Sequence, residues 1–105
     1  MHMFNMQKML KQAQKVQEEM ARVQEELGKE RLEATSGGGV VKVVANGHGD
    51  LLELHIDPAA VDPQDVSMLE DLIVAAVNEA QRAAREMSAQ KMKALTGGFQ
   101  IPGLT

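Results

Sequence analysis

The run SGGGVVK, residues 36–42, contains residue types that a phosphate-binding loop uses: successive glycines, a lysine and a serine. A P-loop needs its glycines to lead into Lys and then Ser or Thr at the start of a helix. Here the glycines lead into VVKVV, a run of β-branched residues that is typical of a strand. The dinucleotide-binding fingerprint fails for the same reason. We therefore interpret the glycines as a tight or bulged link between two strands, and we expect no small-molecule substrate.

Two histidines and two aspartates lie close enough in the sequence to suggest a metal site: His48, Asp50, His55 and Asp57. The chain has no cysteine, so neither a thiolate ligand nor a disulfide is available. If His48 lies in a hairpin turn, His55 stands near the far end of the following strand, several residue rises away. The two imidazoles would not converge, and we expect no metal and no other cofactor.

The hydroxyl side chains offer no evident nucleophile. A serine or threonine nucleophile needs a base within hydrogen-bonding reach. No histidine lies near in sequence to the candidates, which are Thr35, Ser36, Ser67, Ser88 and Thr96. Only a triad assembled by the fold from distant residues is left open. We expect no catalytic residues and therefore a protein that is not an enzyme.

Lysine and arginine side chains form a more informative pattern. When the N-terminal segment is read in heptads, Lys8 and Lys15 share one position with Arg22 and Lys29, and Lys11 lies beside them. The result is a basic stripe along one flank of an expected helix. Such a stripe can bind nucleic-acid phosphates, whose contacts add through counterion release. It is also the pattern of an ordinary solvated helix face.

Pairing within the helix decides which of these cations are free. Glu18 precedes Arg22 by four residues and Glu25 precedes Lys29 by four, which is the favourable orientation for an ion pair. Those two cations are therefore expected to be partly neutralised. Lys15 can reach Glu18 or Glu19, whereas Lys8 and Lys11 have no acid within four residues. The free charge is therefore expected near the N-terminal end of the helix.

The C-terminal half of the chain carries further cations. Arg82 is flanked by Glu79 and Glu86 at helical spacing, so its charge is expected to be compensated. The other cations of this segment have no such neighbour: Arg85, Lys91 and Lys93.

Hydrophobic periodicity identifies the elements that must position these side chains. Residues 6–27 place an apolar residue at every a and d position over about three heptads, which predicts a long amphipathic helix. Its apolar stripe either packs within one chain or meets a second copy in part, and the length of the helix beside a small sheet favours the second alternative. The predicted dimer seam consists of Met6, Met9, Ala13, Val16, Met20, Val23 and Leu27.

Residues 31–57 predict three short antiparallel strands. Apolar and polar residues alternate at the start of this segment, and the runs VVKVVA and LLELHI then flank a glycine-containing turn. If Asn46 lies opposite Gly49 across the turn, apolar side chains face apolar ones on one side of the hairpin, and charged side chains of opposite sign face each other on the other. In that register, we expect Val43 to lie across from Leu52.

The run DPQDV predicts the start of a second helix, with Asp62 as N-cap and Pro63 at the first helical position. The helix is expected to continue to about Ala94, before two glycines. Residues 97–105 predict either a docked extension or a flexible tail. The apolar stripe of this helix consists of Leu69, Leu72, Ile73, Ala76, Ala80, Ala83 and Met87.

Composition places these elements in one α+β domain. A chain of 105 residues fits a single unit, so we expect residues 1–105 to form one domain. The longest apolar run, LIVAAV, is far shorter than the roughly 20 residues that span a bilayer, and the N-terminus lacks the apolar stretch of a secretory signal. We expect a cytoplasmic protein without membrane contact. A net charge of −4 argues against a strongly basic nucleic-acid binder, and two phenylalanines form no platform for stacked bases.

Four blocks in the same order along the chain carry a resemblance: MQKMLKQAQKVQEEM, GGGVVKVVANGHGDLLELHIDP, DPQDVSMLEDLIVAAVNEAQRAA and KMKALTGGFQIPG. They extend over nearly the whole chain, which resembles the YbaB/EbfC family of bacterial nucleoid-associated proteins. The resemblance implies an α-β-β-β-α protomer with a three-stranded antiparallel sheet and two long helices. It also implies a homodimer whose sheets join while the helices project like tweezers and bind duplex DNA. By position, it implies DNA contacts from Lys8, Lys11, Lys15, Arg82 and Arg85.

Two hypotheses about function follow. The first is a dimeric DNA-binding protein of the nucleoid that contacts the backbone of the duplex with little readout of the bases. The second is a protein-interaction module whose heptad helix grips a partner, and the acidic composition and methionine-rich stripe fit it. Retention on generic duplex DNA that weakens as salt rises distinguishes the first from the second.

Overall fold

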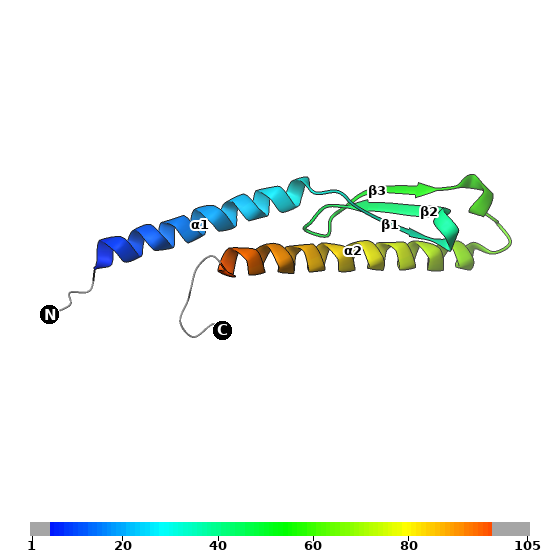
Figure 1. Cartoon of the computed structure of the whole chain (residues 1–105). Helices are drawn as coiled ribbons and strands as arrows, with labels where there is room; N and C mark the ends of the chain where they lie inside the picture. Colours follow the sequence, from blue (N-terminus) through cyan, green and yellow to red (C-terminus); the bar gives the residue numbers. More distant parts are fainter. Residues whose placement is uncertain (1–4, 98–105) are drawn as a thin grey trace.

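The computed structural model describes residues 5–97, which form two long helices and a three-stranded antiparallel sheet (Figure 1). The predicted α+β class and the predicted order of elements are confirmed. Of the expected C-terminal tail only Gly97 is described, as the last residue of the second helix; the rest lies outside the described residues. The elements are α1 (Met6–Lys29), β1 (Leu32–Ser36), β2 (Val41–Ala45), β3 (Leu51–Ile56) and α2 (Val66–Gly97).

Helix α1 starts at an asparagine cap and ends beside α2. The side-chain oxygen of Asn5 accepts a hydrogen bond from the Lys8 amide at 3.1 Å, which satisfies one unpaired donor of the first turn. The N-terminal half of α1 extends past the end of α2, and its C-terminal part lies alongside it (Figure 1). Val23 and Leu27 are buried in this part of the chain. These two members of the predicted dimer seam therefore belong to the core of a single chain.

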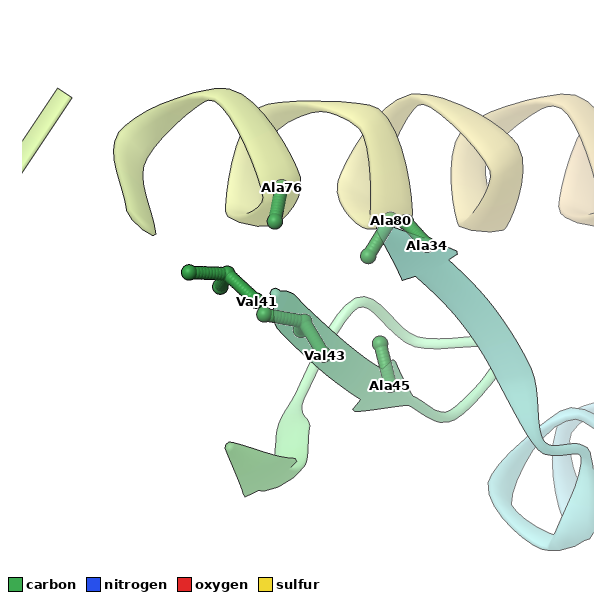
Figure 2. Packing of buried hydrophobic residues seen from close by; sticks show 6 residues of the cluster. All are labelled: Ala34, Val41, Val43, Ala45, Ala76 and Ala80. Carbon is green, nitrogen blue, oxygen red and sulfur yellow. The ribbon is translucent and has the colours of Figure 1, made fainter. Parts of the chain in front are cut away.

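One face of the sheet packs on α2 through small side chains. Ala76 and Ala80 lie on the face of α2 that meets the sheet, opposite Val41 and Val43 of β2 (Figure 2). Because alanine ends at Cβ, the helix can lie close to the strands. Ala84 continues this buried line at the same spacing of four residues, whereas the predicted stripe contained Ala83, which is only partly buried.

The link between β1 and β2 is a short turn that contains Gly37–Gly39. All three glycines have positive φ, at 60°, 73° and 98°, a region that other residues rarely adopt. The Ser36 hydroxyl before the turn donates a hydrogen bond to the Leu72 carbonyl of α2 at 2.6 Å. The prediction of a tight structural link is confirmed.

The register of the second hairpin differs from the expected one by two residues. Val43 pairs with Leu54 and not with Leu52. The turn is one residue longer than expected, because the Asn46 amide donates to the Asp50 carbonyl at 3.0 Å. An irregularity in the pairing beside this turn adds the second residue of shift. A shift of two leaves each side chain on its face of the sheet, so the hydrophobic pattern could not reveal it.

The predicted N-cap of α2 was wrong. The helix begins at Val66, and the Asp65 side chain accepts a hydrogen bond from the Met68 amide at 3.3 Å. Asp62 instead accepts from the Gln64 amide at 2.9 Å and forms a separate turn around Pro63. Both aspartates suit a cap, and the chain uses the one directly before the apolar stripe.

The protein is strongly elongated. Its dimensions are 79 × 23 × 16 Å and its radius of gyration is 20.8 Å, against about 13 Å for a compact domain of this length. Neither of the two long helices that the structure describes has an apolar window sufficient to cross a membrane. The excess length comes from α1, which projects from the body formed by the sheet and α2 (Figure 1).

Candidate nucleic-acid interface

We call α1 together with residues 82–97 of α2 the prong. Within the part of the chain that the structure describes, every lysine or arginine that forms no ion pair lies on the prong, and each is exposed. The cations of the sheet are paired: Arg31 with Glu53, and Lys42 with Glu33 at 3.7 Å. The free cations are Lys8, Lys11, Lys15, Arg85 and Lys93.

The three lysines of α1 share one helix face. Lys8, Lys11 and Lys15 stand at the i, i+3 and i+7 positions, so their ammonium groups extend along about 10 Å of the helix. This is the half of α1 that projects beyond α2 (Figure 1). The sequence predicted free charge here, and within residues 5–97 these side chains form no ion pair. A row of exposed cations on a projecting helix can contact successive phosphates.

Further along α1 the cations are compensated. Arg22 pairs with Glu19 at 2.6 Å and with Glu26 at 2.5 Å, and these hydrogen bonds raise the pKa of its guanidinium. Pairing of Arg22 was expected, but the proposed partner, Glu18, was wrong. The predicted pair of Lys29 with a glutamate four residues earlier is confirmed at 3.3 Å.

The two arginines that the resemblance assigned to DNA contact differ in their surroundings. Arg82 forms ion pairs with Glu79 at 2.7 Å and Glu86 at 2.9 Å, and the hydrogen bonds to these carboxylates raise its pKa further. Hydrogen bonding to Arg82 lowers the pKa of Glu79 in turn. Arg85 forms no ion pair with any residue that the structure describes. Arg85 is therefore the better placed of the two to hold a phosphate.

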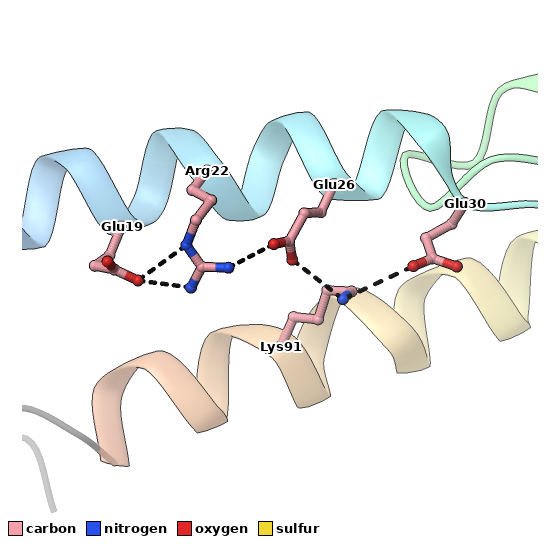
Figure 3. A network of polar contacts seen from close by, with 5 residues as sticks. All are labelled: Glu19, Arg22, Glu26, Glu30 and Lys91. Carbon is pink, nitrogen blue, oxygen red and sulfur yellow. Dashed lines mark hydrogen bonds and ion pairs between the residues drawn. The ribbon is translucent and has the colours of Figure 1, made fainter.

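Lys91 was expected to be free, and the structure shows that it is not. Its ammonium group lies 3.5 Å from Glu26 of α1 and 3.9 Å from Glu30, which caps the C-terminus of α1 (Figure 3). The pair joins the two helices of the prong. Its partners lie in the other helix, more than sixty residues away in sequence, so local spacing gave no signal of them.

Apolar side chains are also exposed on the prong. Met6 and Met9 are 63% and 51% exposed, and Met20 is 39% exposed. These residues belong to the seam predicted for a second copy, of which Val23 and Leu27 are already covered. Among the described residues, the rest of the seam is exposed except Val16, which is partly buried.

The histidines and aspartates around β3 do not form a metal site among the described residues, where no group of three metal-ligating side chains comes together. His48 lies in the turn before β3, whereas His55 lies near its end and pairs with Glu53 at 2.7 Å. Hydrogen bonds from Arg31 and His55 lower the pKa of Glu53 to about 2. The outer face of the sheet thus carries a compensated charge network.

Comparison with known proteins places this arrangement in a family. The chain is 56% identical over 100 residues to a "Nucleoid-associated protein" of Pelotomaculum thermopropionicum, with 95% of each chain covered. It is 57% identical over 103 residues to one of Moorella thermoacetica, with 98% of this chain and 99% of the other covered. An uncharacterized protein of Helicobacter pylori has the same fold, with a TM-score of 0.79 at 21% identity, over 90% of this chain and 99% of that chain. The model of the YbaB/EbfC DNA-binding family matches residues 3–99, and the chain belongs to this family.

Proposed function

We propose that this protein binds duplex DNA at the nucleoid through the free cations of the prong. The observation that carries the proposal is their distribution: in a chain of net charge −4, the uncompensated cations of the described residues all lie on α1 and the C-terminal half of α2, and three of the five lie on the projecting half of α1. The family to which the chain belongs and the names of its relatives agree with DNA as the partner. Phosphate contacts from such cations give affinity that depends on salt.

The contacts are mainly to the DNA backbone. The free cations are four lysines and one arginine of the prong, and a lysine recognises a phosphate as a point charge. Base readout in the major groove needs Arg, Asn or Gln on a helix that enters it. Asn5, Gln7 and Gln12 lie near the tip of α1 and supply at most a weak preference. We infer binding that tolerates changes of DNA sequence.

We further propose that the protein is a homodimer, with residues 1–105 as one domain and with the sheets of two copies joined at β3. β3 is an edge strand, and an edge strand presents unpaired backbone groups to another chain. Its leucines Leu51, Leu52 and Leu54 are 49%, 46% and 50% exposed, which is a large apolar surface for an isolated chain. Two copies would present two prongs to one duplex. No catalytic role, cofactor or small-molecule substrate is part of this proposal, and its setting is the cytoplasm.

A titration of labelled duplex DNA tests the proposal. The purified protein is added to a generic duplex and to its scrambled sequence, and fluorescence anisotropy is recorded over a series of KCl concentrations. We expect similar affinity for both sequences, with log affinity falling linearly with log salt by about 0.9 for each phosphate contact. Absence of binding at low salt contradicts the proposal and leaves the protein-interaction module, which the exposed methionines of α1 favour.

A further inference from the structure

We propose that a cleft between α2 and the turn joining β2 to β3 binds one phosphate group of the DNA backbone; this inference rests on the DNA binding proposed above. The cleft has a volume of about 560 Å³ and is open to solvent. We call it the turn cleft. The residues that define it here are His48 and Gly49 of the turn and Gln81, Ala84, Arg85 and Ser88 of α2.

Helical spacing brings the α2 side chains of the turn cleft together. Gln81, Arg85 and Ser88 stand at the i, i+4 and i+7 positions and so share one face of the helix. Ala84 lies among them and is buried, and its short side chain leaves the floor of the cleft hollow. Larger residues at this position would fill the space.

The turn forms the opposite wall. In Figure 1 the turn between β2 and β3 lies over the middle of α2. The Gln81 side-chain amide donates a hydrogen bond to the Gly49 carbonyl at 3.2 Å, which ties the turn to the helix. The backbone amides of His48 and Asp50 are already bound to the Asn46 side-chain oxygen, at 2.9 and 3.0 Å. An anion in the cleft must therefore be held by side chains.

The side chains that face the turn cleft can donate hydrogen bonds without losing a protein partner. Among residues 5–97, the Arg85 guanidinium, the Ser88 hydroxyl and the His48 ring form no hydrogen bond or ion pair within the chain. None of the described residues that line the cleft is acidic, although the whole chain has more acidic than basic residues. A site with donors and no carboxylate selects an anion over a metal cation or an ammonium group.

The chemistry of these donors fits a phosphate oxyanion. A guanidinium binds two phosphate oxygens at once through parallel N–H groups. The Ser88 hydroxyl can supply a further hydrogen bond from α2, whereas the ring of His48 lies beside Gly28 of α1 and is not counted as a ligand. Arg85 lies about 12 Å along α2 from Lys93, the next free cation of that helix. The turn cleft therefore extends the free cations of the prong to the turn between β2 and β3, where an open cleft admits a phosphodiester.

The test uses the whole protein and three single variants. Arg85→Gln removes the guanidinium, Ser88→Ala removes a hydroxyl without changing charge, and Arg82→Gln is the control that removes the same charge from an arginine held by Glu79 and Glu86. We expect Arg85→Gln to weaken duplex binding about tenfold or more and to reduce the salt slope by about one per protomer. Ser88→Ala should weaken binding about threefold, and Arg82→Gln by less than about twofold. Circular dichroism confirms that each variant is folded.

Nuclear magnetic resonance of the wild-type protein locates the ligand. We expect the duplex to shift the signals of the Gly49 and Ser88 amides, both in residues that line the cleft, and inorganic phosphate to shift the same signals only at much higher concentration. Suppose that Arg85→Gln weakens binding, while Ser88→Ala binds the duplex as tightly as wild type and the duplex leaves these signals unshifted. The proposal that the turn cleft binds a phosphate is then overturned, and the DNA-binding proposal stands. If inorganic phosphate shifts the signals and the duplex does not, the site takes free phosphate and the inference about DNA is overturned. If the wild-type protein binds no duplex at low salt, the proposed function fails and this inference fails with it.

Discussion

At the scale of single residues, a cation of this protein is available to DNA only where no carboxylate already holds it. Arg82 and Arg85 are three residues apart on one helix, yet two glutamates bind the first and none of the described residues pairs with the second. The same contrast separates Lys15 from Arg22 on α1. Pairing in the fold, more than the count of basic residues, therefore defines the candidate interface.

Two glycines of the β2–β3 turn are expected to stabilise the fold for different reasons. A Cβ at Gly47 would lie 2.7 Å from Leu27 Cδ2 and 2.8 Å from the Leu27 carbonyl oxygen, whereas Gly49 faces open space but has φ of 85°. Gly47→Ala should lower the free energy of unfolding by about 1–3 kcal/mol through overpacking, and Gly49→Ala by about 1–2 kcal/mol through backbone strain. Urea unfolding measures both. A Gly47→Ala protein as stable as wild type would show that the turn does not dock on α1 as described.

The lowered pKa of Glu53 makes stability depend on pH. Because Arg31 and His55 lower this pKa from 4.5 to about 2, the folded state binds a proton less readily than the unfolded state. The stabilisation is complete above about pH 4.5 and is lost as the pH falls toward 2. Glu53→Gln should therefore show a smaller drop in melting temperature between pH 6 and pH 3 than wild type. The control Glu70→Gln, at a site with no ion pair among the described residues, should behave like wild type, and equal drops in all three proteins would contradict the assignment.

Local spacing predicted part of this residue-scale pattern. The free Lys8 and Lys11 and the compensated Arg82 agree with the acids present or absent within four residues of each. Lys15 has Glu18 and Glu19 within that range and yet forms no ion pair with any described residue. The partners of Lys91 and the opposition of Arg85, Ser88 and His48 across the turn cleft depend on tertiary contacts. No spacing within one helix contains that information.

At the scale of elements, the geometry of the prong depends on how α1 lies against α2. The junction of α1 with the rest of the protein combines the buried Val23 and Leu27, of which Leu27 lies against Gly47 of the β2–β3 turn, with the ion pairs that Lys91 makes to Glu26 and Glu30 (Figure 3). Exposed ion pairs contribute at most about 1 kcal/mol, whereas a buried leucine contributes several times more. Apolar packing therefore holds α1 to the rest of the protein, and the ion pairs to Lys91 of α2 refine its placement.

A pair of substitutions can rank these two contributions. Leu27→Ala should reduce the free energy of unfolding by about 2–5 kcal/mol, because Leu27 is 1% exposed. Lys91→Gln should reduce it by no more than about 1 kcal/mol. Urea unfolding at one fixed protein concentration gives both values. If Lys91→Gln lowered the free energy of unfolding more than Leu27→Ala, the ion pairs and not the apolar packing would be the larger contribution.

Periodicity predicted the elements themselves better than their junctions. The heptad stripe defined α1 and the apolar runs defined the strands, because each pattern extends over a whole element. The N-cap of α2 and the register of the hairpin were wrong because each depends on one or two residues. Asp62 and Asp65 are equally good caps in sequence, and a two-residue slip preserves every face of the hairpin.

At the scale of the whole molecule, the elongated chain exposes two apolar surfaces, one on α1 and one on the β3 edge. Joining two copies at β3 would cover the leucines of the edge and leave the prongs free. The methionine part of the predicted seam offers the alternative contact. The two arrangements place the prongs differently, so the oligomeric contact decides how DNA is held.

Sedimentation of two double variants distinguishes these contacts. If two copies join at β3 as proposed, Leu52→Glu with Leu54→Glu should convert the dimer into a monomer at micromolar concentration, because charge buried at the joint is costly. Met6→Glu with Met9→Glu should leave the dimer intact. If the methionine variant dissociates and the leucine variant does not, the copies meet through α1.

The central claim is that free cations of the prong bind the DNA backbone, and one comparison of salt-dependent DNA binding tests it most directly. Lys8, Lys11 and Lys15 are changed together to Gln in one variant, and the paired Arg22 and Lys29 in another, and anisotropy of a labelled duplex is measured over a KCl series. In a dimer the first set supplies six cations, so if all contact phosphate the log-log slope of wild type approaches about −5, and the triple variant should lose most of its binding. The double variant should bind nearly as well as wild type, because its cations are held by glutamates. Unchanged binding by the triple variant, or equal losses in both variants, would contradict the claim.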